Sequence, residues 1–161
     1  MSDTANLTKV YVDLPNHWAT GGESLWARPL GGDRYELRNV PFHAYDLNFR
    51  DIVQAVPHAS GEKPRVRRVI IRSGHQTLRV FFDKSLPEEK RLELVRSLKP
   101  LHVSFERATR SVFALDLEPG VDMVLVRTEL DQWAESGWAE YETCEARVAD
   151  SFDDAPEPPA E

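Results

Sequence analysis

The chain has 161 residues, of which 41% are hydrophobic and 29% are charged, a mixture that excludes an intrinsically disordered chain and indicates a folded core. Its net charge of −7 argues against a nucleic-acid backbone as the main ligand, because such binding needs clustered Lys and Arg. No apolar stretch approaches the roughly 18 residues of a membrane span, and the first residues lack the pattern of a signal peptide. The single cysteine, Cys144, cannot form an internal disulfide, so the features together predict a cytoplasmic protein.

The first half of the chain consists of predicted strands and loops. The strands are expected at residues 7–14, 23–30, 34–40 and 65–72. Between the last two, only a weak helical pattern is present, and Asp51 is expected to begin a turn. We predict a small β-rich domain over residues 1–75, built as a strongly bent β-sheet or a barrel. The strand at 65–72 is expected to continue through residues 73–75 into a hairpin with the next strand.

The second half begins with a predicted strand at 77–83, where Leu78, Val80 and Phe82 share one face. Ser85 and Glu88 have the spacing of a capping box, and a predicted helix follows that ends before Pro100. Alternating apolar residues then predict a hairpin with strands at 101–105 and 111–117.

An amphipathic helix is expected over residues 123–134, ended by Gly137, and a strand over 138–145 closes the series. The resulting β-α-β-β-α-β order predicts a ferredoxin-like α+β domain with an antiparallel sheet over residues 76–148. Residues 149–161 are acidic and rich in proline, and we expect them to form a disordered tail.

One candidate ligand-binding segment surrounds Gly21-Gly22 and contains His17, Trp18, Glu23 and Trp26. Two indole rings offer stiff contact area, glycine lets the backbone approach a ligand, and His17 or Glu23 can exchange protons. The alternative is that both Trp side chains fill the core of the β-rich half while His17 caps a turn.

A second candidate segment contains His43, Tyr45 and Asp46. An Asp can orient an imidazole and leave its other nitrogen free for a substrate, although no nucleophile accompanies these residues at a recognisable spacing. The alternative is structural hydrogen bonding within a loop.

A third candidate lies at a predicted tight turn, where Arg72 and His75 flank Ser73-Gly74. Such groups can together hold a phosphate or a carboxylate. The alternative is that they are ordinary polar residues of a turn.

Motifs for metals, cofactors and RNA are missing from the sequence. None of the five His residues lies in a His-x-x-x-His pair, and no glycine-rich nucleotide motif is present. The aromatic motif by which sheets of this strand order bind RNA is missing too. We therefore predict neither a metal nor a cofactor, and whether the protein is an enzyme is left open.

The sequence resembles an uncharacterised bacterial family, the domain of unknown function 4265. The resemblance rests on five segments: Lys9-Val-Tyr-Val-Asp13, Trp26-Ala-Arg28, Tyr35-Glu-Leu-Arg-Asn-Val-Pro-Phe42, Ala44-Tyr-Asp-Leu-Asn-Phe-Arg-Asp-Ile-Val53 and Tyr141-Glu-Thr143. It implies a bacterial cytosolic protein whose two halves form one recurrent unit. The family brings no activity that can be assigned to particular residues.

Three functions are compatible with these observations. The first is a non-catalytic module that binds an unknown small molecule or protein through its Trp-rich loop and can form a homodimer through its sheet. The second is a small enzyme, possibly a hydrolase, which uses His and Asp groups in a cleft between the halves. The third is an antitoxin-like or regulatory protein that binds another protein.

Overall fold

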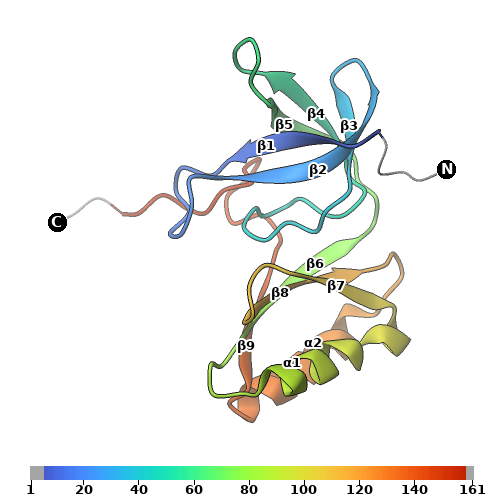
Figure 1. Cartoon of the computed structure of the whole chain (residues 1–161), viewed down its shortest axis with the longest axis vertical. Helices are drawn as coiled ribbons and strands as arrows, with labels where there is room; N and C mark the ends of the chain where they lie inside the picture. Colours follow the sequence, from blue (N-terminus) through green and yellow to red (C-terminus); the bar gives the residue numbers. More distant parts are fainter. Residues whose placement is uncertain (1–5, 159–161) are drawn as a thin grey trace.

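The computed structural model describes residues 6–158 and has the mixed α+β architecture that the sequence predicts. A β-barrel forms one half, a second β-sheet lies beside it, and the two α-helices of the described chain lie beyond that sheet (Figure 1).

Five strands of the N-terminal half close into a barrel. In order around the barrel they are β1 (Thr8–Asp13), β2 (Gly22–Gly31), β3 (Arg34–Leu37), β4 (Ile52–Pro57) and β5 (Pro64–Ile71). Neighbouring strands are antiparallel, except that β1 meets β5 in a short parallel pairing that completes the closure. Of the two arrangements that the sequence allowed, the barrel is the one that forms.

β4 is the strand that the sequence analysis missed. Its Val53 and Ala55 face the barrel core and are fully buried. The adjacent apolar pair Ile52 and Val53 interrupts the alternation expected of a strand, and the pairing of β4 with β5 shifts register at the same place. Such a bulge hides a strand from pattern analysis, because one extra residue breaks the period of two.

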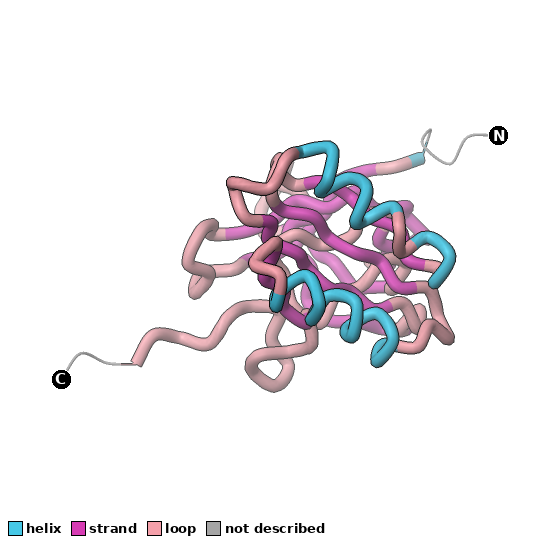
Figure 2. The backbone as a smooth tube through the Cα atoms, turned by 90° about the horizontal axis from the view of Figure 1, so that it is seen from below, coloured by secondary structure: helices cyan, strands magenta, loops and turns pink. Residues whose placement is uncertain are grey.

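The C-terminal half is a four-stranded antiparallel sheet with two helices on one face (Figure 2). Its elements in chain order are β6 (Gln76–Phe82), α1 (Glu88–Arg96), a short 3-10 helix (Lys99–Leu101), β7 (Val103–Arg107), β8 (Val112–Leu117), α2 (Met123–Glu135) and β9 (Ala139–Thr143). The strand order in the sheet is β7-β8-β6-β9. Leu78, Val80 and Phe82 of β6 face the helices and are buried in one apolar core, as their alternation predicts.

Two local predictions in this half are wrong. β5 ends in the barrel and β6 begins in the other sheet, so the hairpin expected between them does not form. The capping box does not form either, because Pro87 is the N-cap of α1, Ser85 donates to Asp83, and Glu88 pairs with Arg107 at 2.7 Å. The hairpin fails because its two strands join different sheets, and the capping box fails because Ser85 and Glu88 bind Asp83 and Arg107 instead.

Part of the predicted disordered tail packs against the barrel. Phe152 contacts the barrel core, and its carbonyl oxygen accepts a hydrogen bond from the Tyr45 N–H at 2.8 Å. Asp153 is buried and accepts from the Asn16 N–H at 2.7 Å. The expectation of disorder is therefore wrong for the stretch around Phe152 and Asp153. The composition of the tail is polar on average, but the single aromatic side chain of Phe152 is enough to pack against the barrel core. Residues 159–161 of the predicted tail lie outside the described residues.

Candidate functional site

The loop between β1 and β2 and the segment between β3 and β4 bring two imidazoles and one indole together. The His17 ring stacks on Trp18 with centroids 5.7 Å apart, and the His17 and His43 rings form a T-shaped pair with centroids 4.9 Å apart. The Trp18 side chain is 83% exposed, so it does not fill the barrel core. These three residues, which we call the aromatic surface, present flat rings to solvent at one end of the barrel.

Glu23 is buried beneath this surface and fixes the segment that carries His43. Its carboxylate accepts the backbone N–H groups of Phe42 at 2.6 Å, His43 at 3.0 Å and Ala44 at 3.0 Å. Three charge-assisted hydrogen bonds occupy most of the acceptor capacity of one carboxylate. Glu23 therefore acts through the backbone and positions His43, with little capacity left to act as a base.

His43 is biased toward its neutral form. Partial burial lowers the pKa of its imidazole, the nearby Glu23 carboxylate opposes that change, and the neighbouring His17 adds to it. In His17, Nδ1 accepts from the Ala19 N–H at 3.0 Å, which leaves the proton of the neutral ring on Nε2. The two rings thus differ in their hydrogen bonding, although they touch.

The second tryptophan of the loop lies apart from the aromatic surface. Trp26 is on β2, is 44% exposed, and has the Lys9 ammonium over its ring at 4.9 Å. The missing side chain of Gly22 leaves room for the Tyr11 ring, because a Cβ at that position would overlap the Tyr11 hydroxyl. The alternative that both Trp side chains fill the core is therefore wrong, whereas Gly21 has open space around it.

Tyr45 and Asp46 do not join His43 in one reactive group. Tyr45 is buried and donates its hydroxyl to Glu142 Oε2 at 3.1 Å, whereas Asp46 pairs with Arg72 at 2.9 Å. The carboxylate expected to orient His43 is thus bound by Arg72 instead. Burial is also the main cause that raises the pKa of the Tyr45 hydroxyl, with Glu142 adding to it.

The predicted anion-binding turn is internally paired as well. The Arg72 guanidinium binds Asp46, and His75 Nδ1 lies 2.8 Å from the buried Asp116 carboxylate. Burial raises the pKa of the Asp116 carboxyl, while the hydrogen bond from His75 opposes that change. Arg72 and His75 therefore hold two different carboxylates of this chain.

Arg79 is the residue that sequence reasoning missed. Its side chain is 1% exposed and lies between the sheet and the segment that follows β3, which Figure 1 shows running between the two halves. The guanidinium donates to Glu142 at 2.8 Å and to the carbonyl oxygens of Pro41, His43 and Ala44 at 3.2, 3.2 and 2.8 Å. On β6 it alternates with Leu78 and Val80, so it lies on the face opposite to the helix-covered core, where the sequence pattern gives no sign of burial.

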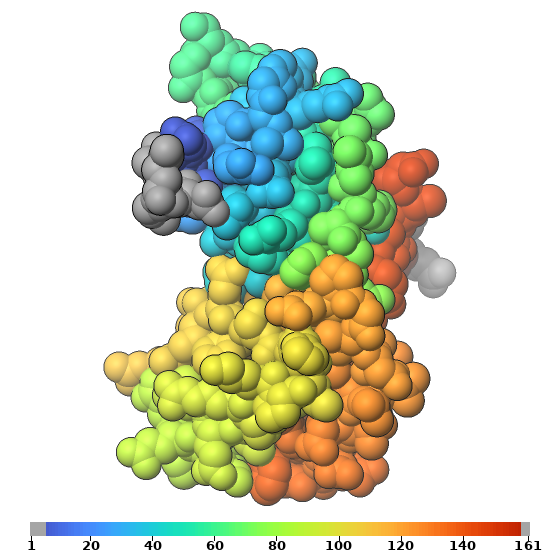
Figure 3. All heavy atoms as spheres, turned by 90° about the vertical axis from the view of Figure 1, so that its right-hand side faces the viewer, coloured from blue at the N-terminus to red at the C-terminus, as the bar shows by residue number. Residues whose placement is uncertain are grey.

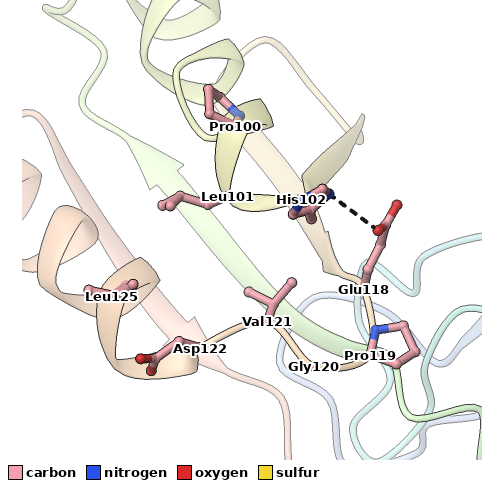
Figure 4. A pocket seen from close by; sticks show the side chains of 9 residues that line it. All are labelled: Pro100, Leu101, His102, Glu118, Pro119, Gly120, Val121, Asp122 and Leu125. Atoms are coloured by element: carbon pink, nitrogen blue, oxygen red, sulfur yellow. Dashed lines mark ion pairs between the residues drawn. The ribbon is translucent and has the colours of Figure 1, made fainter.

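A separate pocket of about 400 Å³ lies between the 3-10 helix and the segment that joins β8 to α2. Leu101, Val121 and Leu125 contribute apolar side chains, and His102 faces Glu118 at 3.6 Å (Figure 4). Both members of this pair are more than half exposed, so solvent screens their attraction. None of the candidate residues from the sequence lies there.

Within residues 6–158, no group of three or more His, Cys, Asp or Glu side chains is arranged to hold a metal ion. In the same part of the chain, no helix is long and apolar enough to cross a membrane.

The fold and these contacts define a mixed α+β protein with an exposed aromatic surface on its barrel. The model of the domain of unknown function (DUF4265) matches residues 23–141, and the chain belongs to this family. A search of curated proteins finds no match. Among solved structures, a hypothetical protein from Neisseria gonorrhoeae aligns over 86% of this chain and 94% of its own length, with a TM-score of 0.73 and 14% identity. At that identity the likeness shows a common fold alone.

Proposed function

We propose that the protein is a non-catalytic binding module, and that the aromatic surface of His17, Trp18 and His43 holds a flat group of a small molecule or of a partner protein. The observation that carries this proposal is Trp18, which is 83% exposed and stacks on His17. Exposed aromatic side chains that neighbours hold in place give contact area at low entropic cost.

The carboxylates near the aromatic surface support binding over catalysis. Glu23 is engaged by three backbone amides, and Asp46 is held by Arg72. A general base needs a free acceptor within hydrogen-bond reach of the substrate proton, and neither carboxylate offers one.

The test is an NMR titration of the ¹⁵N-labelled protein with three planar probes, indole, adenosine and tryptophanamide. We expect at least one probe to shift the Trp18 indole N–H and the His43 amide in a saturable way. Trp18→Ala should abolish these shifts. Trp26→Ala is the matched control and should leave them intact, because Trp26 lies on β2 under Lys9. Shifts that persist in Trp18→Ala, or that map to Trp26 alone, would exclude this surface.

A hydrolytic enzyme is the second candidate, and one observation favours it. The lowered pKa of His43 keeps a neutral imidazole beside His17, and a neutral imidazole is the form that accepts a proton. Turnover of p-nitrophenyl acetate that is lost in both His17→Ala and His43→Ala, while both variants stay folded, would replace the binding proposal. Equal turnover in the wild type and the two variants would exclude the enzyme.

The organisation that we propose for the chain follows its two cores. Separate buried clusters in the barrel and beneath the helices support a domain boundary near residue 75. The order β6-α1-β7-β8-α2-β9, with β6 and β8 at the centre of the sheet, supports a ferredoxin-like assignment of residues 76–148. A cytoplasmic location, for which the single cysteine argues, completes the proposal.

A further inference from the structure

The outer edge of β7 presents backbone groups that no other strand of the described chain pairs with. In the sheet, β7 has β8 as its one neighbour. The bonds that flank this pairing, from the Ala108 N–H to the Val112 carbonyl and from the Glu118 N–H to the His102 carbonyl, show that even-numbered residues of β7 turn their backbone toward β8. Because backbone groups alternate along a strand, Val103, Phe105 and Arg107 direct theirs outward.

A groove runs along this edge, between β7 and α1. It measures about 220 Å³ and is lined by the apolar Val95, Val103 and Phe105 together with Arg96 and Lys99. Residues near 100, coloured yellow in Figure 3, lie at the surface of the C-terminal half. A strand edge beside an apolar groove is the arrangement by which several domains bind an extended peptide as an added strand.

The charges along the groove select the partner. Arg96 and Lys99 are exposed, and neither has an ion pair within residues 6–158. Arg107, at the other end of β7, pairs with Glu88 at 2.7 Å. An antiparallel pairing with a second copy would bring Arg107 of one copy toward Arg96 and Lys99 of the other, and like charges oppose that contact.

We propose that the β7 edge binds an extended, acidic segment of a partner protein by strand addition. Val103, Phe105 and Arg107 supply the backbone hydrogen bonds, alternate side chains of the segment enter the apolar groove, and its carboxylates meet Arg96 and Lys99. This site is independent of the aromatic surface, which lies on the barrel, so either proposal can fail without the other.

The experiment uses the full chain and a fluorescein-labelled peptide, Glu-Glu-Val-Thr-Val-Thr-Val-Glu-Glu, in an anisotropy titration. A peptide with its first and last Val replaced by Pro keeps the charge but cannot complete the strand pairing. We expect the first peptide to bind and the second to bind at least about tenfold more weakly, a difference of one decade in Kd. Equal binding of both peptides, or binding of neither, overturns the proposal.

Variants and hydrogen exchange locate the site. Arg96→Glu with Lys99→Glu should weaken binding about tenfold or more, as loss of complementary charge does. The matched control is Arg67→Glu with Arg68→Glu, an exposed basic pair on β5, which should bind like the wild type.

In the free protein, the amides of Val103, Phe105 and Arg107 should exchange faster than those of Ser104 and Glu106, and the peptide should protect the first three. Peptide binding without this protection places the site elsewhere and overturns the proposal. Protection that rises with protein concentration in the absence of peptide identifies a second copy as the partner and also overturns it.

Discussion

The guanidinium carbon of Arg79 lies 4.8 Å from the centre of the Tyr45 ring, and both side chains reach the same carboxylate, that of Glu142. Arg79 and Glu142 belong to neighbouring strands of the sheet, whereas Tyr45 belongs to the segment between two barrel strands. This contact joins the two cores. It also sets the position of the segment that carries His43, since Arg79 donates to the carbonyl oxygens of Pro41, His43 and Ala44.

Replacement of Arg79 by Met should lower the free energy of unfolding by about 3 kcal/mol, because Glu142 and three carbonyl oxygens lose their donor. Arg79→Lys should cost less, since it keeps the charge but lacks the planar set of donors. Urea denaturation measures both values. Arg67→Met, on an exposed part of β5, is the control, and a cost for Arg79→Met no larger than for this control would contradict the role of Arg79.

Glu23→Gln should lower the free energy of unfolding by about 2 kcal/mol, since one neutral amide oxygen replaces a carboxylate that accepts three backbone N–H groups. The amides of residues 42–44 should then exchange faster with solvent. Glu140→Gln, an exposed position on β9, should leave both measurements unchanged. If exchange at residues 42–44 stays slow in Glu23→Gln, the carboxylate does not hold this segment.

His43 should titrate below its ordinary pKa of 6.5, and NMR of its ring carbons measures the value. His17→Gln should raise the pKa of His43, because the positive charge of a protonated His17 disfavours a second one, whereas Glu23→Gln should lower it further. A His43 that titrates at or above 6.5 would contradict this account.

The same shift makes stability depend on pH in a known direction. Below the ordinary pKa of 6.5, the unfolded chain takes up a proton at His43 that the folded chain does not. The free energy of unfolding should therefore fall as the pH drops through this window and level off below the pKa of the folded state. His43→Asn should flatten that part of the profile, and an unchanged slope would show that another group causes it.

Cys144 should resist thiol reagents in the folded protein. Its side chain is buried, and burial raises the pKa of the thiol to about 12, so the reactive thiolate is scarce at neutral pH. Labelling by 5,5′-dithiobis(2-nitrobenzoic acid) should be slow in buffer and complete within the mixing time in denaturant. Fast labelling of the native protein would show that the segment after β9 opens.

Phe152→Ala should lower the free energy of unfolding by about 2 kcal/mol, because a partly buried ring leaves the barrel core. A chain that ends after residue 155 should unfold like the full-length protein, since it retains Phe152 and Asp153. Thermal denaturation of the two variants distinguishes these cases. If Phe152→Ala leaves the free energy of unfolding unchanged, the tail contributes nothing to stability.

The amino-acid sequence by itself predicted the elements whose signals are local. The alternation of Leu78, Val80 and Phe82 identified β6, and Gly137, with its positive φ of 73°, marked the end of α2. These predictions depend on periodicity and on backbone conformation, which neighbouring residues determine. The sequence analysis did not predict β4, because a register shift beside Val53 breaks the local period of two.

The tertiary structure decided the partners of the charged and aromatic side chains. Arg79, Glu23 and Asp116 are ordinary polar residues in the sequence, and each is buried because a distant segment supplies its hydrogen-bond partners. The sequence left open whether Trp18 fills the core or lies at the surface, and its place depends on how the β1–β2 loop meets His43. Contacts across long sequence separations depend on how the two halves pack, and no local pattern encodes that packing.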